Sequence, residues 1–93
     1  MAKEIILTMV IRREQKGYAA WCPELDIASQ GETFEDAKKN LREAVGVYVE
    51  TVVADGAVQE LLERLGTTYE DFKKKEVVHP ESFSGSFEVP IAI

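Results

Sequence analysis

The chain has 93 residues, of which 45% are hydrophobic and 30% charged, a composition typical of one soluble domain with a single core. Its apolar runs are shorter than the roughly 20 residues of a membrane-spanning helix, and its first residues do not resemble a secretory signal. A single cysteine cannot form an internal disulfide, which suits the reducing cytoplasm where we expect the protein to reside.

The net charge of −6 disfavours binding to nucleic-acid phosphates, because such binding depends on Lys and Arg. An acidic surface instead speeds encounter with a basic partner. Solubility alone explains the same charge equally well, so the charge leaves both interpretations open.

The chain begins with a pattern typical of a strand inside a sheet. Residues 5–11 are apolar on both alternating sets of positions, whereas a strand exposed on one face alternates apolar and polar residues. Gly17 suits a hairpin bend, and a second strand is predicted over 18–22, before Pro23. Residues 25–30 predict a loop leading into a third short strand, which Gly31 ends.

A long amphipathic helix is predicted next. Thr33 is a suitable N-cap, with Asp36 in the place of the capping-box Glu, and Gly56 suits the end of the helix. Apolar residues recur at steps of three and four, as in a helix with one face against a core: Phe34, Ala37, Leu41, Ala44, Val45, Tyr48 and Val52.

A small helical insert is predicted at about 57–86. It comprises a helix over about 57–65, a third short helix containing Tyr69 and Phe72, and an irregular stretch over 77–85. A final strand follows, in which Phe87, Val89, Ile91 and Ile93 alternate with other residues.

Pro90 confines this final strand to an edge of the sheet. The predicted fold is therefore a single α+β domain over residues 1–93. Its strands form a β-β-β-α-β sheet in the order 3-2-1-4, with the long helix on one face.

Four stretches carry a resemblance to a known family. Residues 17–26 read GYAAWCPELD, 29–37 read SQGETFEDA, 40–48 read NLREAVGVY, and 87–91 read FEVPI. They resemble the G-Y-x-A-x-C-P-E-L, S-Q-G-D-T-x-E-E-A and N-L-x-E-A-x-x-x-Y stretches and the closing strand of HicB-type antitoxins.

This resemblance implies a degenerate, partial RNase H-like fold and a protein partner, the HicA toxin. That toxin is a small basic nuclease with a double-stranded-RNA-binding-like fold, and the antitoxin covers its active surface and usually self-associates. Longer members add a C-terminal DNA-binding domain, whereas this chain carries a helical insert instead. The leading hypothesis is therefore a non-enzymatic protein that neutralises a toxin by occlusion.

Catalytic and metal sites are not expected. RNase H chemistry needs carboxylates around two Mg²⁺ ions, one of them on the central strand. Residues 5–11 contain no Asp or Glu, so that central ligand is missing, although Glu50 on the helix and Glu88 on the last strand remain. Cys22 lacks a base that the sequence places nearby, since His79 is the only histidine, and a small buried residue at a strand end is the favoured interpretation. We expect no cofactor.

The candidate partner interface consists of Trp21, Glu24 and Asp26. Trp21 and Tyr18 lie out of phase in their strand, so at most one of them lies under the helix. An aromatic residue on an open sheet is a natural interface anchor. For Trp21, an interface role is slightly favoured over packing in the core. An exposed strand edge also predicts a homodimer or higher oligomer.

Two alternatives remain. The helix–Gly–helix rhythm of residues 61–70 is shared by DNA-binding units, and Lys73, Lys74 and Lys75 are the possible DNA contacts. Glu70 opens the would-be recognition helix, however, which favours a packed helical hairpin. The third hypothesis is an orphan scaffold for a small ligand or another protein, which a closed apolar pocket would support.

Overall fold

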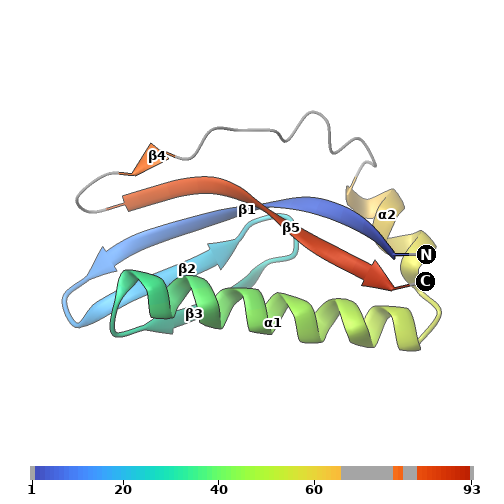
Figure 1. Cartoon of the computed structure of the whole chain (residues 1–93), viewed down its shortest axis with the longest axis horizontal. Coiled ribbons are helices and arrows are strands. Elements are labelled where there is room, and N and C mark those ends of the chain that lie inside the picture. The colour runs from blue at the N-terminus through green and yellow to red at the C-terminus, as the bar shows by residue number, and fades with distance from the viewer. Residues whose placement is uncertain (1, 66–76, 79–81, 93) are drawn as a thin grey trace.

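The computed structural model describes residues 2–65, 77–78 and 82–92. Figure 1 shows one sheet with a long helix along one of its faces. The elements, in chain order, are β1 (Ala2–Glu14), β2 (Gly17–Cys22), β3 (Ile27–Gly31), α1 (Phe34–Ala54), α2 (Val58–Leu65), β4 (Val77–Val78) and β5 (Ser82–Ala92). The third short helix predicted from the sequence lies outside the described residues.

The sheet is antiparallel, with the strand order β3-β2-β1-β5-β4. The prediction of an interior first strand is confirmed, because β1 pairs with β2 on one side and with β5 on the other. The predicted order 3-2-1-4 is also confirmed, with β5 as the fourth strand of that prediction.

The irregular stretch predicted over 77–85 is wrong in part. Val77 and Val78 form the short strand β4 on the outer side of β5, and β5 already begins at Ser82. The segment from Ser82 to Ser86 pairs in register with Arg12 to Thr8. Its alternating serines give no apolar signal, and the pairing depends instead on the length of β1, so the predicted insert ends before residue 82.

The core lies between α1 and the sheet. Alternate residues of β1 are buried there, and directly paired residues of β5 share the same face. The fully buried side chains of the described residues include Leu7, Met9, Ile11, Cys22, Leu41, Val45, Val49 and Ile91. The apolar spacing that predicted the helix is therefore the spacing that packs it on the sheet.

Both ends of α1 are formed as the sequence predicted. The Thr33 Oγ accepts a hydrogen bond from the Asp36 N–H at 3.0 Å, and the chain leaves the helix through Gly56 at φ +70°, where glycine has no steric cost. In the described part of the chain, neither helix combines the length and hydropathy needed to cross a membrane.

The predicted edge position of the last strand holds for the half of β5 that contains Pro90, because β4 pairs only with Phe83 and Ser84 among the described residues. Pro90 lies opposite Glu4 in the register. Thr8 directs its N–H toward the β2 side of β1, and Glu4 has the same orientation because residues alternate along a strand. The Pro90 nitrogen therefore faces the outer edge of β5, where its missing N–H removes no hydrogen bond to β1.

Candidate protein-interaction site

The face of the sheet opposite α1 carries an exposed aromatic residue, and we call it the open face with reference to the described residues alone. Val10, Trp21 and Ala28 lie side by side across β1, β2 and β3, and the Trp21 side chain is 44% exposed. Tyr18, in the opposite phase, packs edge-on against the Phe34 ring of α1 at 6.1 Å between centroids. The predicted division of the two aromatic residues between two faces is confirmed.

The turn between β2 and β3 brings Asp26 to Trp21. The Trp21 Nε1–H points at the Asp26 Oδ1, 3.4 Å away, which is long for a hydrogen bond, and both residues are exposed. Asp26 has φ 54°, the left-handed region that Asp tolerates better than most residues. Two of the three predicted interface residues thus lie together on the surface.

Glu24, the third predicted residue, has a structural role. Both of its carboxylate oxygens accept the Thr8 backbone N–H at 3.0 Å, and one accepts the Thr8 Oγ–H at 2.7 Å. The other oxygen lies 3.6 Å from the Cys22 Sγ. We call this set of three residues, Thr8, Cys22 and Glu24, the Glu24 clasp.

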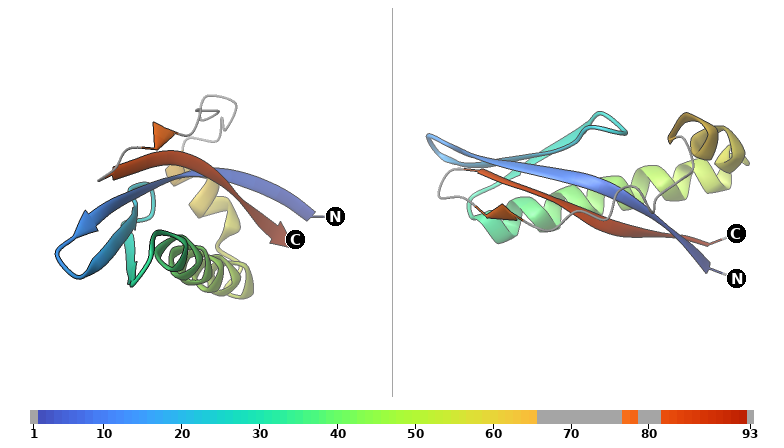
Figure 2. Two further views of the ribbon diagram at one scale, coloured as in Figure 1. Left: turned by 60° about the vertical axis from the view of Figure 1, so that its left-hand side comes forward. Right: turned by 90° about the horizontal axis from the view of Figure 1, so that it is seen from above.

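The divergence of two strands explains the Glu24 clasp. The β1–β2 register stops at Val10 and Trp21, and beyond it the β2–β3 ribbon turns away from β1, as Figure 2 shows from above. The Thr8 N–H then has no strand partner, and a half-buried backbone donor must be satisfied elsewhere. A carboxylate from the turn provides a charge-assisted hydrogen bond. The sequence pattern gave no signal for this contact between residues 16 positions apart.

Cys22 is unsuited to nucleophilic chemistry. Its side chain is fully buried at the end of β2, which confirms the small-buried-residue interpretation. Burial raises the pKa of the Cys22 thiol from 9.0 to about 12, and the nearby Glu24 carboxylate adds to this rise. The thiolate is therefore scarce at neutral pH. His79, the base considered for it, lies outside the described residues.

The raised pKa of Cys22 predicts a loss of stability in alkali. The Cys22 thiol ionises near pH 9 in the unfolded chain and near pH 12 in the folded protein. Its contribution to the free energy of unfolding is therefore complete below pH 9 and is lost as the pH rises from 9 to 12. Between pH 8 and pH 10 the free energy of unfolding should fall by roughly 1.4 kcal/mol more for the wild type than for Cys22→Ala. Urea unfolding at both pH values measures this difference. The prediction is contradicted if the free energy of unfolding falls by the same amount between pH 8 and pH 10 in the wild type and in Cys22→Ala.

Two relatives share about half of this chain. A UPF0150 protein of Synechocystis sp. is 42% identical over 50 residues, which are 52% of this chain and 63% of the relative. A UPF0150 protein of Helicobacter pylori (strain J99) is 35% identical over 52 residues, which are 55% of this chain and 72% of the relative. The chain belongs to the UPF0150 family. No family model and no solved structure matches this UPF0150 protein, and its match spans less than two thirds of the Synechocystis relative.

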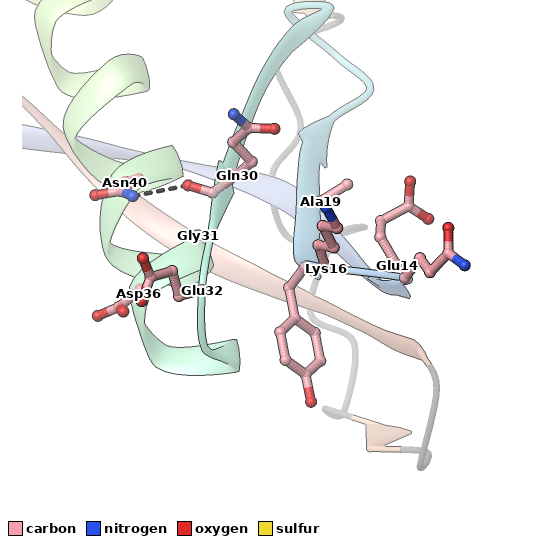
Figure 3. Close-up of a pocket in the computed structure, with 10 residues that line it drawn as sticks. Glu14, Lys16, Ala19, Gln30, Gly31, Glu32, Asp36 and Asn40 are labelled. Atoms are coloured by element: carbon pink, nitrogen blue, oxygen red, sulfur yellow. Dashed lines mark hydrogen bonds between the residues drawn. The ribbon is translucent and has the colours of Figure 1, made fainter.

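A concavity of this UPF0150 protein lies at the β1–β2 turn, between β3 and the start of α1 (Figure 3). It is an open hollow of about 750 Å³, lined mainly by polar side chains: Glu14, Gln15, Lys16, Tyr18, Ala19, Gln30, Gly31, Glu32, Asp36 and Asn40. The Asn40 Nδ2 donates to the Gln30 carbonyl at 2.7 Å. This hollow is open and polar, so it is not the closed apolar pocket that would support the orphan-scaffold hypothesis.

The remaining predicted residues of the UPF0150 protein are separated or not described. Glu88 lies on the open face opposite Ile6, whereas Glu50 is exposed on α1, on the other side of the sheet. Among the described residues, no three His, Cys, Asp or Glu side chains are grouped to hold a metal ion. The possible DNA contacts Lys73, Lys74 and Lys75 lie outside the described residues.

Proposed function

We propose that this UPF0150 protein is a HicB-like antitoxin, which binds a small basic RNA-cleaving toxin of the HicA type and covers its active surface. Membership of the UPF0150 family and the resemblance of residues 17–26 to HicB antitoxins support the class. The observation that carries the choice of surface is Trp21, which is 44% exposed on the open face beside an exposed carboxylate.

The mechanism is occlusion and involves no chemical step on this chain. A large aromatic side chain that becomes fully desolvated is the typical energetic centre of a protein interface. Asp26, beside it, is placed to pair with a Lys or Arg of a basic partner, and the net charge of −6 speeds encounter with that partner. The Glu24 clasp fixes the turn that carries Asp26. Glu24 thus positions Asp26 for the partner and does not itself contact the partner.

The proposal is tested with the full chain as bait. Small basic proteins that it retains are purified alone and assayed on an RNA of defined sequence, with this chain titrated in. We expect cleavage to stop near one chain per toxin. The Trp21→Ala variant should need at least about tenfold more protein for the same protection, because a central aromatic anchor is lost.

Val47→Ala is the matched control, because Val47 is the other large hydrophobic residue exposed in the described chain, 64% exposed on the outer side of α1. It should protect as well as the wild type. The chain alone, with added Mg²⁺, should leave the RNA intact. RNA cleavage by the purified chain, or captured proteins that cut RNA equally well with and without it, would overturn the proposal.

A further inference from the structure

The indole ring of Trp21 is accessible from the β3 side. Its neighbour on that strand is Ala28, which is itself exposed and has only a methyl group as side chain. Ala28 therefore covers little of the ring, and 44% of Trp21 is exposed. The face of an indole is electron-rich and attracts a cation placed within about 6 Å of its centre.

This chain already uses such contacts at two other aromatic rings. The Lys38 ammonium lies 5.5 Å from the centre of the Phe34 ring, and the Arg42 guanidinium lies 5.6 Å from the centre of the Phe87 ring. Among the described residues, no Lys or Arg lies over Trp21 in this way. Trp21 thus differs from Phe34 and Phe87 in presenting its ring to a cation from outside the described chain.

The Asp26 carboxylate lies at the nitrogen edge of the same ring. Its Oδ1 is 3.4 Å from the Trp21 Nε1, a distance that makes a weak hydrogen bond. Within the described part of the chain, the second oxygen of Asp26 accepts no hydrogen bond, and no Lys or Arg pairs with the carboxylate. Asp26 therefore has the capacity to accept a charged donor without giving up a strong bond.

Both side chains are attached to fixed backbone. Trp21 lies in β2, which pairs with β1 on one side and with β3 on the other, and the Glu24 clasp ties the turn before Asp26 to Thr8. A site whose backbone is fixed in advance loses little conformational entropy when a ligand binds.

We propose, on the basis of the proposed function, that Trp21 and Asp26 together bind one arginine side chain of the basic partner. A guanidinium is planar, so it can stack on the indole while an N–H at its rim donates to the carboxylate at the ring edge. The ammonium of lysine is a compact, strongly hydrated charge and gains less from an aromatic face. The site should therefore distinguish arginine from lysine, which simple charge attraction does not.

The test uses the purified, ¹⁵N-labelled full chain with no toxin present. The probes are three blocked tripeptides with arginine, lysine or citrulline between two glycines, titrated at constant ionic strength. Trp21 is the single tryptophan, so its indole N–H gives one NMR signal. The arginine peptide should shift this signal in a saturable manner, the lysine peptide should bind about threefold or more weakly, and uncharged citrulline should not saturate.

Two variants assign the site. Asp26→Asn keeps the tryptophan reporter and a residue that tolerates the left-handed backbone, and it should weaken binding of the arginine peptide about threefold or more. Glu50→Gln removes the same charge from an exposed position on α1 and should bind the peptide as the wild type does.

The proposal is overturned if the arginine peptide leaves the indole signal in place, if the lysine peptide binds equally well, or if Asp26→Asn binds like the wild type. None of these measurements contains a toxin. Capture of an RNA-cleaving protein without any preference for the arginine peptide would therefore refute the arginine site and leave the proposed function standing, and the reverse pair of results would do the opposite.

Discussion

Gly31→Ala should destabilise the protein by about 3 kcal/mol, which lowers the melting temperature by roughly 12 °C or more. A Cβ at this position would lie 2.4 Å from the Ala37 N, 2.7 Å from the Asp36 carbonyl carbon and 2.8 Å from the Asp36 Cβ. Two of these atoms are backbone in the first turn of α1, so no side-chain rotation relieves the overlap. The helix and β3 must separate, which opens the core at its closest approach.

Gly46→Ala is the control for this substitution. Gly46 lies within α1, and a Cβ there meets nothing within 4 Å. Because alanine has a higher helix propensity, this variant should gain up to about 1 kcal/mol. Urea unfolding followed by the fluorescence of Trp21, the single tryptophan, measures both variants. If Gly31→Ala unfolds at the wild-type urea concentration, the close helix–strand approach is wrong.

Glu24→Ala should cost about 2–3 kcal/mol, because it removes the acceptor of the Thr8 N–H and Oγ–H and leaves a half-buried backbone donor unsatisfied. The turn that holds Asp26 also loses its attachment to β1. We therefore expect a change in Trp21 fluorescence in the folded state, before any unfolding. Urea denaturation gives the free energy, and the native emission spectrum reports the turn.

Glu50→Ala is the matched control, since Glu50 is an exposed carboxylate on α1. It removes the same charge and should change stability by no more than about 0.5 kcal/mol. Glu24→Gln keeps one acceptor oxygen and should fall between Glu24→Ala and the wild type. The structural role of the Glu24 clasp fails if Glu24→Ala and Glu50→Ala unfold at the same urea concentration.

Elements with local signals could be predicted from the sequence. The cap at Thr33, the apolar spacing and Gly56 specify α1 within one segment of chain, and the two apolar sets of residues 5–11 indicate a strand with neighbours on both sides. β5 was only partly predicted, because its first half is serine-rich. That half becomes a strand through pairing with β1, which sequence periodicity does not register.

The candidate site divides in the same way. Strand alternation alone separated Trp21 from Tyr18, and the structure places them on opposite faces. The proximity of Asp26 to Trp21 follows from a tight turn and could be predicted from the sequence. The role of Glu24 was not, because it depends on where β2 leaves β1, and that point is set by the packing of the whole sheet over α1.

The pairing of β1 with β5 joins Ala2 to Ala92 and continues to Arg12 and Ser82. The β1–β5 pairing in the middle of the sheet thus joins the residues that are farthest apart in the sequence. It can form only when most of the chain lies in the loop between the two strands. During synthesis, one edge of β1 therefore lacks its partner strand until β5 leaves the ribosome. Ribosome-stalled chains that stop after α2 should therefore remain protease-sensitive and aggregation-prone, and the sheet should form only when synthesis has passed β5.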